Sequence, residues 1–426
     1  MYQSPYLIKF NVMCHLVNIV AKKFQNMKIV LILGAGSTLD NAKSHNDYDN
    51  PPLDKHFFRR TSSFLVNNLK MDPKKRKKLL DRFECLKDYF QKRHHINICA
   101  NSKDSLEKIA STLFKDVRTK AFPDSYLVFL AFLMILCDIL GETTNEMGND
   151  RENPLYRIID SYLKEGVNPD NITIISFNYD IFAEKVLATI ALHSQHYCQI
   201  NSLDPDSVVY YLQNGYELDL QSSDITLPPR PIQGYFPRNP GMNKFGIKIL
   251  KLHGSLNWYS LYPSKMSFAL MYNKNRKLKV SGEKAIYSSL LKYRDPNGRV
   301  HKTLPIIVPP IKKKTQIFHS KILNLWPKAK KALINADEIL IYGYSCPRSD
   351  KECQKLLKTA IYDNKKITAV SVINPDPDIC DRYIELLNPK KILWYRYSYL
   401  FEDRDFLLRR YAAIEDLFGS RCLENV

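Results

Sequence analysis

The feature that most constrains this chain is the stretch from Lys28 to Ser37, which reads KIVLILGAGS. Its apolar run is too short for a helix and ends at a glycine, which is typical of a strand buried on both faces in a parallel sheet. Gly34, Ala35 and Gly36 then turn the chain, and glycine lets backbone N–H groups approach a phosphate closely. Doubly wound α/β proteins hold dinucleotides at such a strand and turn. The stretch therefore predicts an α/β fold with a ligand site after its first strand.

The glycine turn alone leaves its function open. A complete dinucleotide fingerprint has a third glycine, and none follows Gly36 here. Ser37 adds a hydroxyl donor that suits a phosphate, but an ordinary tight turn between a strand and a helix uses the same residues. The glycine turn is therefore compatible both with nucleotide binding and with a purely structural role.

The cysteines bear on the compartment and on metals. The chain has 426 residues, enough for two or three domains, and its nine cysteines include no C-x-x-C pair. Scattered thiols of this kind favour a reducing, cytoplasmic setting and argue against structural zinc. We therefore expect a cytoplasmic protein with no bound metal.

The N-terminal residues do not have the pattern of a secretory signal. His15 and Asn18 interrupt the apolar patch there, and no small-residue cleavage site follows. Met27 lies immediately before the first strand, so we expect translation to begin at Met27. Residues 1–26 are then an extension outside the fold, and we place the boundary of the N-terminal extension (1–27) immediately before the first strand.

The charge of the chain bears on its partners. Its formal net charge is +19, which suits an anionic partner such as nucleic acid or a dinucleotide. The lysines are spread along the chain, which favours a solvated basic surface instead. Nucleic acid is therefore at most an indirect partner in this interpretation.

Residues 56–165 have a helical pattern with no β pattern between, so we interpret them as an α-helical insertion. Asp72, followed by a proline, marks one helix start, and Asp104 is the expected cap of a later helix. The most apolar run, Tyr126–Cys137, is followed by Asp138 and is too short to cross a bilayer. It predicts a buried helix and no membrane partner.

Around this insertion, short β-branched runs alternate with helical patterns. That alternation predicts a Rossmann-like, doubly wound, mostly parallel sheet in a discontinuous domain of residues 28–55 and 166–426. The expected later strands are Ile172–Phe177, Ile247–Leu252, Glu338–Tyr342, Thr368–Ile373 and Lys391–Tyr395. The other expected segments are an irregular excursion over 195–245, an aromatic loop over Ser255–Ser264, and helices over Trp326–Asn335 and Phe401–Phe418.

Polar or small residues follow these strands where each one ends. Asn178 and Asp180 follow the second strand, and His253 follows the third. Gly343 and Ser345 follow the fourth strand, and Asn374 follows the fifth. Because ligands bind at the carboxyl ends of parallel strands, we expect these residues to form one site.

The order of these clusters resembles the NAD-binding domain of the sirtuin superfamily. Sirtuins carry a GAG-x-S turn, an N-x-D, an H-G, a G-x-S and a late asparagine in that order. The fuller strings resemble the sirtuin-like NADases of bacterial anti-phage defence more than the deacylases. Those strings are GAGST, PPLDKHFF, ISFNYD, KLHGSLNW, IIVPP, IYGYSCPRSD and VINPDPD, and they span about residues 28–400.

The resemblance implies a role for each cluster. Asn178 would position a water or a ribose hydroxyl under the nicotinamide ribose, Asp180 would orient that site, and His253 would be the general base. The residues implied to bind NAD⁺ are Gly34, Ala35, Gly36 and Ser37 at the pyrophosphate, and Gly343, Ser345 and Asn374 at the adenosine half.

The chemistry of NAD⁺ cleavage fits these residue types. Loss of nicotinamide leaves an oxocarbenium-like sugar, so the enzyme needs a base that titrates near neutrality, which histidine supplies, and no strong nucleophile. Structural explanations also exist. His253 can be a buried histidine bonded to the backbone, while Asn178, Asp180 and Ser345 can cap the helices that follow them.

The activity implied by the resemblance is NAD⁺ hydrolysis to nicotinamide and ADP-ribose. Deacylating sirtuins carry a four-cysteine zinc module after the H-G motif, whereas here no cysteine lies between His253 and Cys346. The missing module favours hydrolysis over protein deacylation, which is the second hypothesis. A basic nucleic-acid-binding module without activity is the third.

The resemblance also implies a biological setting. An NADase that depletes NAD⁺ on phage infection would kill its host if always active, so we expect a gate. A homo-oligomer, or a partner protein such as a HerA-type translocase or an Argonaute-like subunit, would supply that gate.

Overall fold

The computed structural model describes most of the predicted elements. The described residues are 25–40, 54–67, 71–99, 104–145, 153–193, 246–262, 268–270, 292–294, 300–311, 320–367, 369–374 and 376–387. The predictions for residues 1–24, 195–245, Lys391–Tyr395 and Phe401–Phe418 lie outside them.

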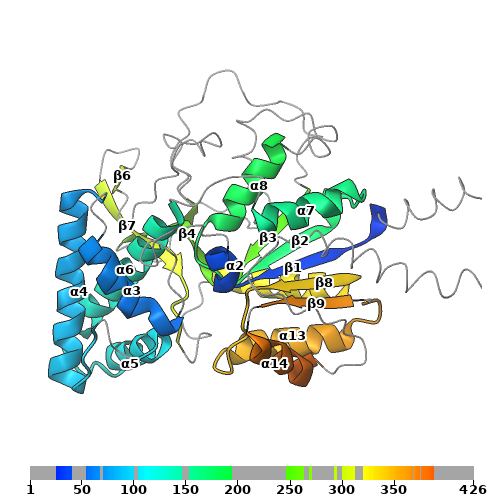
Figure 1. Ribbon diagram of the computed structural model, residues 1–426. Coiled ribbons are helices and arrows are strands. Elements are labelled where there is room, and N and C mark those ends of the chain that lie inside the picture. The colour runs from blue at the N-terminus through cyan, green and yellow to red at the C-terminus, as the bar shows by residue number, and fades with distance from the viewer. Residues whose placement is uncertain are drawn as a thin grey trace, which may run out of the picture.

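A five-stranded, all-parallel sheet forms the centre of the molecule, which confirms the α/β class (Figure 1). Its strands are β1 (Ile29–Leu33), β2 (Ile172–Ser176), β3 (Lys248–Lys251), β8 (Glu338–Tyr342) and β9 (Ala369–Ile373). They lie in the order β3-β2-β1-β8-β9. The chain therefore winds from β1 to β3 in one direction and from β8 to β9 in the other.

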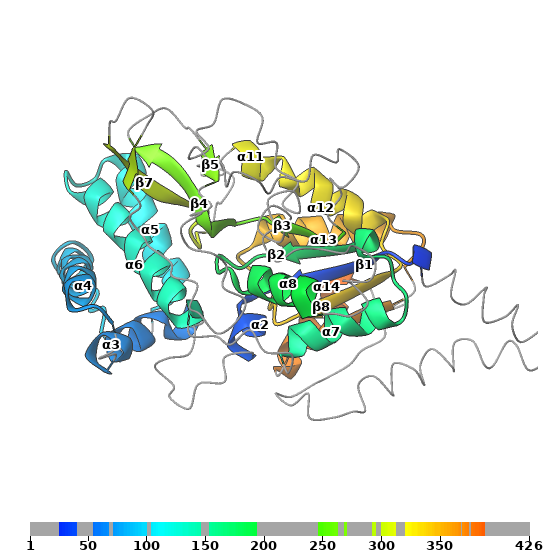
Figure 2. The ribbon, with the colours of Figure 1, turned by 90° about the horizontal axis from the view of Figure 1, so that it is seen from above.

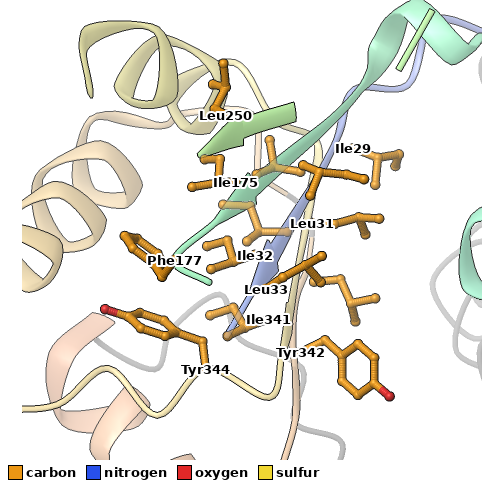
Figure 3. Packing of buried hydrophobic residues seen from close by; sticks show 14 of the residues in the cluster. Ile29, Leu31, Ile32, Leu33, Ile175, Phe177, Leu250, Ile341, Tyr342 and Tyr344 are labelled. Atoms are coloured by element: carbon orange, nitrogen blue, oxygen red, sulfur yellow. The ribbon is translucent and has the colours of Figure 1, made fainter. Parts of the chain in front are cut away.

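Helices cover both faces of this sheet, as the continuous apolar strands require. On one face lie α7 (Pro154–Lys164) and α8 (Phe182–His193), and on the other α13 (Lys351–Asp363) and α14 (Pro377–Leu387) (Figure 1). Every residue of β1 and β8 is buried. Figure 3 shows Ile32, Ile175 and Ile341 from three neighbouring strands packed together. The remaining described helices near the sheet are α2 (Ala35–Asp40), η2 (Pro169–Asn171), α11 (Ser320–Leu323) and α12 (Leu325–Ile334).

The segment between β1 and β2 is helical, as the sequence predicts. Its elements are η1 (Asp54–His56), α3 (Phe57–Asn67), α4 (Pro73–His94), α5 (Leu106–Thr119), α6 (Ser125–Asn145) and α7. Helices α3 to α6 share a second hydrophobic core and lie together beside the sheet, and we call them the helical layer (Figure 2). The apolar side chains of α7 pack in the core of the sheet instead. The division into domains stays a prediction.

Two helix starts test the expected caps. Asp72 caps α4 as predicted, because its side chain accepts a hydrogen bond from the Lys75 N–H at 2.9 Å. The prediction for Asp104 is wrong, since the cap of α5 is Ser105, whose Oγ accepts from the Lys108 N–H. Asp104 instead pairs with the side chain of Lys108.

The apolar helix α6 runs past Asp138 to Asn145, further than the apolar run alone predicts. Inside this helix the carboxylate of Asp138 pairs with Arg82 of α4, whose Nη1 lies 2.9 Å from Asp138 Oδ2. Among the described residues, Ser125–Thr144 is long and apolar enough to cross a membrane, but core helices of globular proteins share those properties. Of that stretch, 61% is buried, as expected for a helix that packs against α4 and α5.

The aromatic loop predicted over Ser255–Ser264 is wrong for its described part, which is a strand. A second, antiparallel sheet contains β5 (Phe268–Leu270), β4 (Gly254–Tyr262), β7 (Val300–Ile307) and β6 (Lys292–Arg294), in that order. The register shifts between Ser255 and Tyr259, and Pro305 of β7 lies opposite Tyr259. The bulge interrupts the period of two in β4, so the sequence of this strand resembles a loop.

Candidate active site

Three glycines interlock at the carboxyl edge of the parallel sheet. The N–H of Gly36 donates to the carbonyl of Gly343 at 2.9 Å. A Cβ added to Gly34 would lie 2.4 Å from Tyr344 Cα, and one added to Gly343 would lie 2.0 Å from the Ser37 nitrogen. Gly343 also has a φ of +63°. Close packing of the turns after β1 and β8 therefore requires glycine at these positions.

Several donors of the glycine turn are already used inside the protein. The Gly34 N–H donates to the Tyr342 carbonyl, and Gly36 donates to Gly343. The N–H and the Oγ of Ser37 both donate to the Gly34 carbonyl, at 2.9 and 2.7 Å. The ordinary-turn interpretation thus explains these glycines, and the binding of a pyrophosphate by Gly34, Ala35, Gly36 and Ser37 stays a prediction.

The glycine turn lies where the strand order reverses. The chain leaves β1 toward β2, whereas β8, on the other side of β1, leads to β9. Open α/β sheets bind ligands outside the strand ends at such a reversal. The turns that begin at Gly34 and Gly343 flank this point.

Asn178 and Asp180 are joined to the glycine turn through Thr38. The Asn178 Nδ2 donates to the Gly34 carbonyl at 2.9 Å and to Thr38 Oγ1 at 3.0 Å. Thr38 Oγ1 in turn donates to Asp180 Oδ2 at 2.9 Å, and Asp180 Oδ1 accepts from the Phe182 N–H at the start of α8. Asp180 therefore caps α8 and also supports the turn. Sequence reasoning missed Thr38, although it directly follows the GAGS string.

Lys251 is a second residue that the sequence analysis missed. It is fully buried on β3, and its Nζ donates to the Asp180 carbonyl. The same Nζ lies 3.2 Å from Glu184 Oε1, in a pair whose side chains are 1% and 2% exposed. The available signal was a lysine between apolar residues near the end of a strand, because a lysine buried there needs an anionic partner.

His253 lies at the carboxyl end of β3, buried and held by the backbone. Its Nδ1 lies 3.2 Å from the Phe177 carbonyl oxygen, which can only accept a hydrogen bond. Nδ1 therefore carries the proton in the neutral ring, and the lone pair is on Nε2. Nε2 faces Asp350 Oδ2 at 3.7 Å and Cys353 Sγ at 3.8 Å. The Val308 N–H fixes the His253 carbonyl at 2.8 Å.

Aromatic rings surround His253. The Phe177 ring stacks on Tyr344 with centroids 4.2 Å apart (Figure 3), and the rings of Phe177, Tyr179 and Trp326 lie 5.3, 6.2 and 6.5 Å from the imidazole. Burial raises the pKa of Tyr179 and of Tyr344 well above 10, and the charge of Asp350 adds to both shifts. Both phenols are therefore neutral donors. Tyr179 donates to the Val308 carbonyl at 2.6 Å.

The structure brings Asn178 and His253 to the same edge of the sheet. They follow the adjacent strands β2 and β3, and His253 contacts the carbonyl of Phe177, the residue before Asn178. The other predicted residues have structural partners. Asn374 Oδ1 accepts from the Asp376 N–H before α14, and the Ser345 carbonyl accepts from Arg382. A role for Gly343, Ser345 or Asn374 at an adenosine stays a prediction.

Asp350 and Cys353 were not among the predicted site residues. Asp350 caps α13, with its Oδ1 accepting from the Cys353 N–H at 3.4 Å. The sequence offered a signal for the cap, an aspartate immediately before a helical pattern, but none for the nearness of Asp350 to His253. A scan against protein-family models and a search of curated proteins found no match to this chain.

Proposed function

We propose that this protein is an NAD⁺ hydrolase that releases nicotinamide and ADP-ribose. In this proposal the parallel sheet is a Rossmann-like, doubly wound sheet of the sirtuin type, and NAD⁺ binds at the reversal of strand order. The observation that carries the proposal is the orientation of His253. Its Nε2 lone pair is fixed by the Phe177 carbonyl, one residue from Asn178 and on the edge that holds the glycine turn.

The reaction needs one proton acceptor and one water. The bond between the nicotinamide nitrogen and the ribose breaks with its electron pair going to nicotinamide, which leaves as a neutral molecule. A water then attacks the cationic sugar carbon and gives a proton to His253 Nε2, which passes it to solvent. The balance is NAD⁺ and water to nicotinamide, ADP-ribose and a proton, and histidine can accept that proton near neutral pH.

Asn178 suits the position beside a cationic sugar. Both of its amide hydrogens are donated, to the Gly34 carbonyl and to Thr38 Oγ1. The Asn178 side-chain oxygen is therefore the atom that can accept a hydrogen bond from a water or a ribose hydroxyl. As a neutral group it holds that oxygen without forming an ion pair with the cation.

The setting we propose is the cytoplasm of a cell under phage attack. Depletion of NAD⁺ would stop the infected cell, and a homo-oligomer or a partner protein, such as a HerA-type translocase or an Argonaute-like subunit, would hold the enzyme inactive until then. This part of the proposal rests on the resemblance of the motifs alone.

The test measures nicotinamide release from NAD⁺ by chromatography, with the protein alone and with the products of neighbouring genes. We expect Asn178→Ala to lower the rate by about 100-fold or more. The matched control is Asn171→Ala, which removes an asparagine at the opposite end of β2, where it bonds the Gln25 carbonyl. It should keep the rate within about two-fold. No release by the folded wild type in either condition, even with a metal chelator present, or equal rates in the two variants, would contradict the proposal.

A further inference from the structure

Three side chains of types that can bind a metal converge at the sheet edge, and one of them is the proposed base. His253 comes from the end of β3, and Asp350 and Cys353 from the first turn of α13. The ligand atoms of His253, Asp350 and Cys353 all lie within 4.8 Å of one another, and the three residues are 4%, 3% and 0% exposed. Sequence spacing does not reveal such a set, because a zinc motif is recognised by closely spaced cysteines and histidines.

The orientation of His253 is that of a metal ligand. Histidines that bind metals generally donate the other ring N–H to a carbonyl or a carboxylate, which points the lone pair at the ion. Here Nδ1 faces the Phe177 carbonyl, and Nε2 faces the other two groups. The Asp350 carboxylate is divided in a similar way, with Oδ1 at the helix cap and Oδ2 facing the imidazole at 3.7 Å and accepting from the Tyr344 hydroxyl at 3.4 Å.

The spacing fits a small tetrahedral ion. With ordinary zinc bond lengths, neighbouring ligand atoms around a tetrahedral zinc are about 3.3–3.6 Å apart. The two distances from Nε2, 3.7 Å to Asp350 and 3.8 Å to Cys353, are a few tenths of an ångström above these values, and the Asp350 and Cys353 ligand atoms lie within 4.8 Å of each other. Nitrogen, oxygen and sulfur donors together suit zinc better than magnesium or calcium.

The same geometry disagrees with a cysteine protease-like relay. In such a relay the acid contacts one imidazole nitrogen and the nucleophile contacts the other. Here Asp350 and Cys353 both face Nε2, while Nδ1 is bonded to the backbone. Cys353 is therefore not positioned as a nucleophile that His253 activates with help from Asp350.

We propose that His253, Asp350 and Cys353 bind one zinc ion, and that the ion holds the hydrolase inactive by occupying the lone pair of His253. Binding converts the Cys353 thiol to a thiolate and releases its proton to solvent. The three protein ligands leave the fourth tetrahedral position for a water. The binding part stands on geometry alone, whereas the inhibition part rests on the proposed NAD⁺ hydrolysis.

The binding test uses the purified full chain, stripped of metal and titrated with Co²⁺ and then Zn²⁺. We expect about one Co²⁺ per chain with a thiolate-to-cobalt absorption band, which Zn²⁺ then displaces. Cys353→Ala should remove the band, and Asp350→Asn, which keeps a helix cap, should weaken binding by at least about 10–100-fold.

Cys137→Ala is the matched control, since Cys137 is an equally buried cysteine in the helical layer. It should bind Co²⁺ as the wild type does. No Co²⁺ binding by the folded wild type, or an unchanged band in Cys353→Ala, would overturn the metal site.

The inhibition test measures nicotinamide release with added Zn²⁺ and with a chelator. We expect Zn²⁺ to lower the wild-type rate and the chelator to restore it, whereas the rates of Cys353→Ala with and without Zn²⁺ should be equal. Metal binding without any NAD⁺ hydrolysis would keep the site and reject the proposed function. Hydrolysis by the metal-bound wild type at the chelated rate would reject the inhibition.

Discussion

Two histidine–aspartate pairs are built differently at the sheet edge and in the helical layer. In the helical layer, His94 Nε2 lies 2.6 Å from Asp116 Oδ2, which also accepts from the Tyr89 hydroxyl at 2.9 Å. At the sheet edge, His253 Nε2 lies 3.7 Å from Asp350 Oδ2. The first pair is in direct hydrogen-bond contact, and the second is longer than a hydrogen bond.

The helical layer therefore holds a pair in direct contact, whereas at the sheet edge His253 and Asp350 are each held by other partners. His94 and Asp116 satisfy each other, so the pair needs nothing further. At the sheet edge the backbone and the helix cap fix His253 and Asp350, and they do so without closing the distance between them. Substitutions near the sheet edge can therefore be compared with similar substitutions elsewhere in the molecule.

The largest effect on stability is expected from the buried ion pair at the edge. Lys251→Met removes the cation beside Glu184, which leaves a buried carboxylate without that partner, and should lower the free energy of unfolding by about 3–5 kcal/mol. The equivalent change in the helical layer, Lys87→Met, breaks an exposed pair with Glu84 and should cost at most about 1 kcal/mol. Chemical denaturation measures both. Equal losses of stability would mean that the buried pair of Lys251 and Glu184 contributes no more than the exposed pair.

A smaller effect is expected from the interlocked glycines. Gly343→Ala places a Cβ against the Ser37 nitrogen at a left-handed φ, and should cost about 3 kcal/mol or more. Gly166 has a φ of +86° but nothing within 4 Å of its added Cβ, so Gly166→Ala should cost only about 1–2 kcal/mol of strain. The thermal unfolding of the two variants distinguishes the cost of the steric clash at Gly343 from the cost of backbone strain alone at Gly166. If Gly343→Ala lowers the stability no more than Gly166→Ala does, the close packing of the two glycine turns is contradicted.

The smallest effect is expected at Asp40, at the end of α2. Burial raises the pKa of its carboxyl group, and the hydrogen bond from Tyr342 opposes that shift. An acid whose pKa is higher in the folded state destabilises the fold when ionised, so stability falls as the pH rises through the folded pKa. Asp40→Asn should therefore stabilise the protein slightly at pH 7 and leave it unchanged below the ordinary carboxyl pKa. Stabilisation that is equal at both pH values would contradict this account.

The sequence predicts the parallel sheet well because its strands are short runs rich in Ile, Leu and Val. The expected strand Glu338–Tyr342 coincides with β8, and Ile247–Leu252 exceeds β3 by one residue at each end. The polar residues after these strands lie at one edge, since parallel strands end together.

The remainder depends on partners that are distant in the sequence. Gly254–Tyr262 is a strand because it pairs with Val300–Ile307. The local sequence of Gly254–Tyr262 does not indicate that pairing. The side-chain contacts of Lys251, Asp350 and Cys353 described above are with residues about 70 to 100 positions away in the sequence. Residue types and spacing predicted Asn178 and His253 as site residues. The groups around the His253 Nε2 could be found only from the folded structure.

The most direct measurement compares nicotinamide release from NAD⁺ by His253→Ala and His94→Ala, each corrected for the folded fraction. The account predicts a loss of about 100-fold or more for His253→Ala and a rate within about two-fold of the wild type for His94→Ala. Equal rates in the two variants would show that the imidazole at the sheet edge does no chemistry, and that contradicts the account.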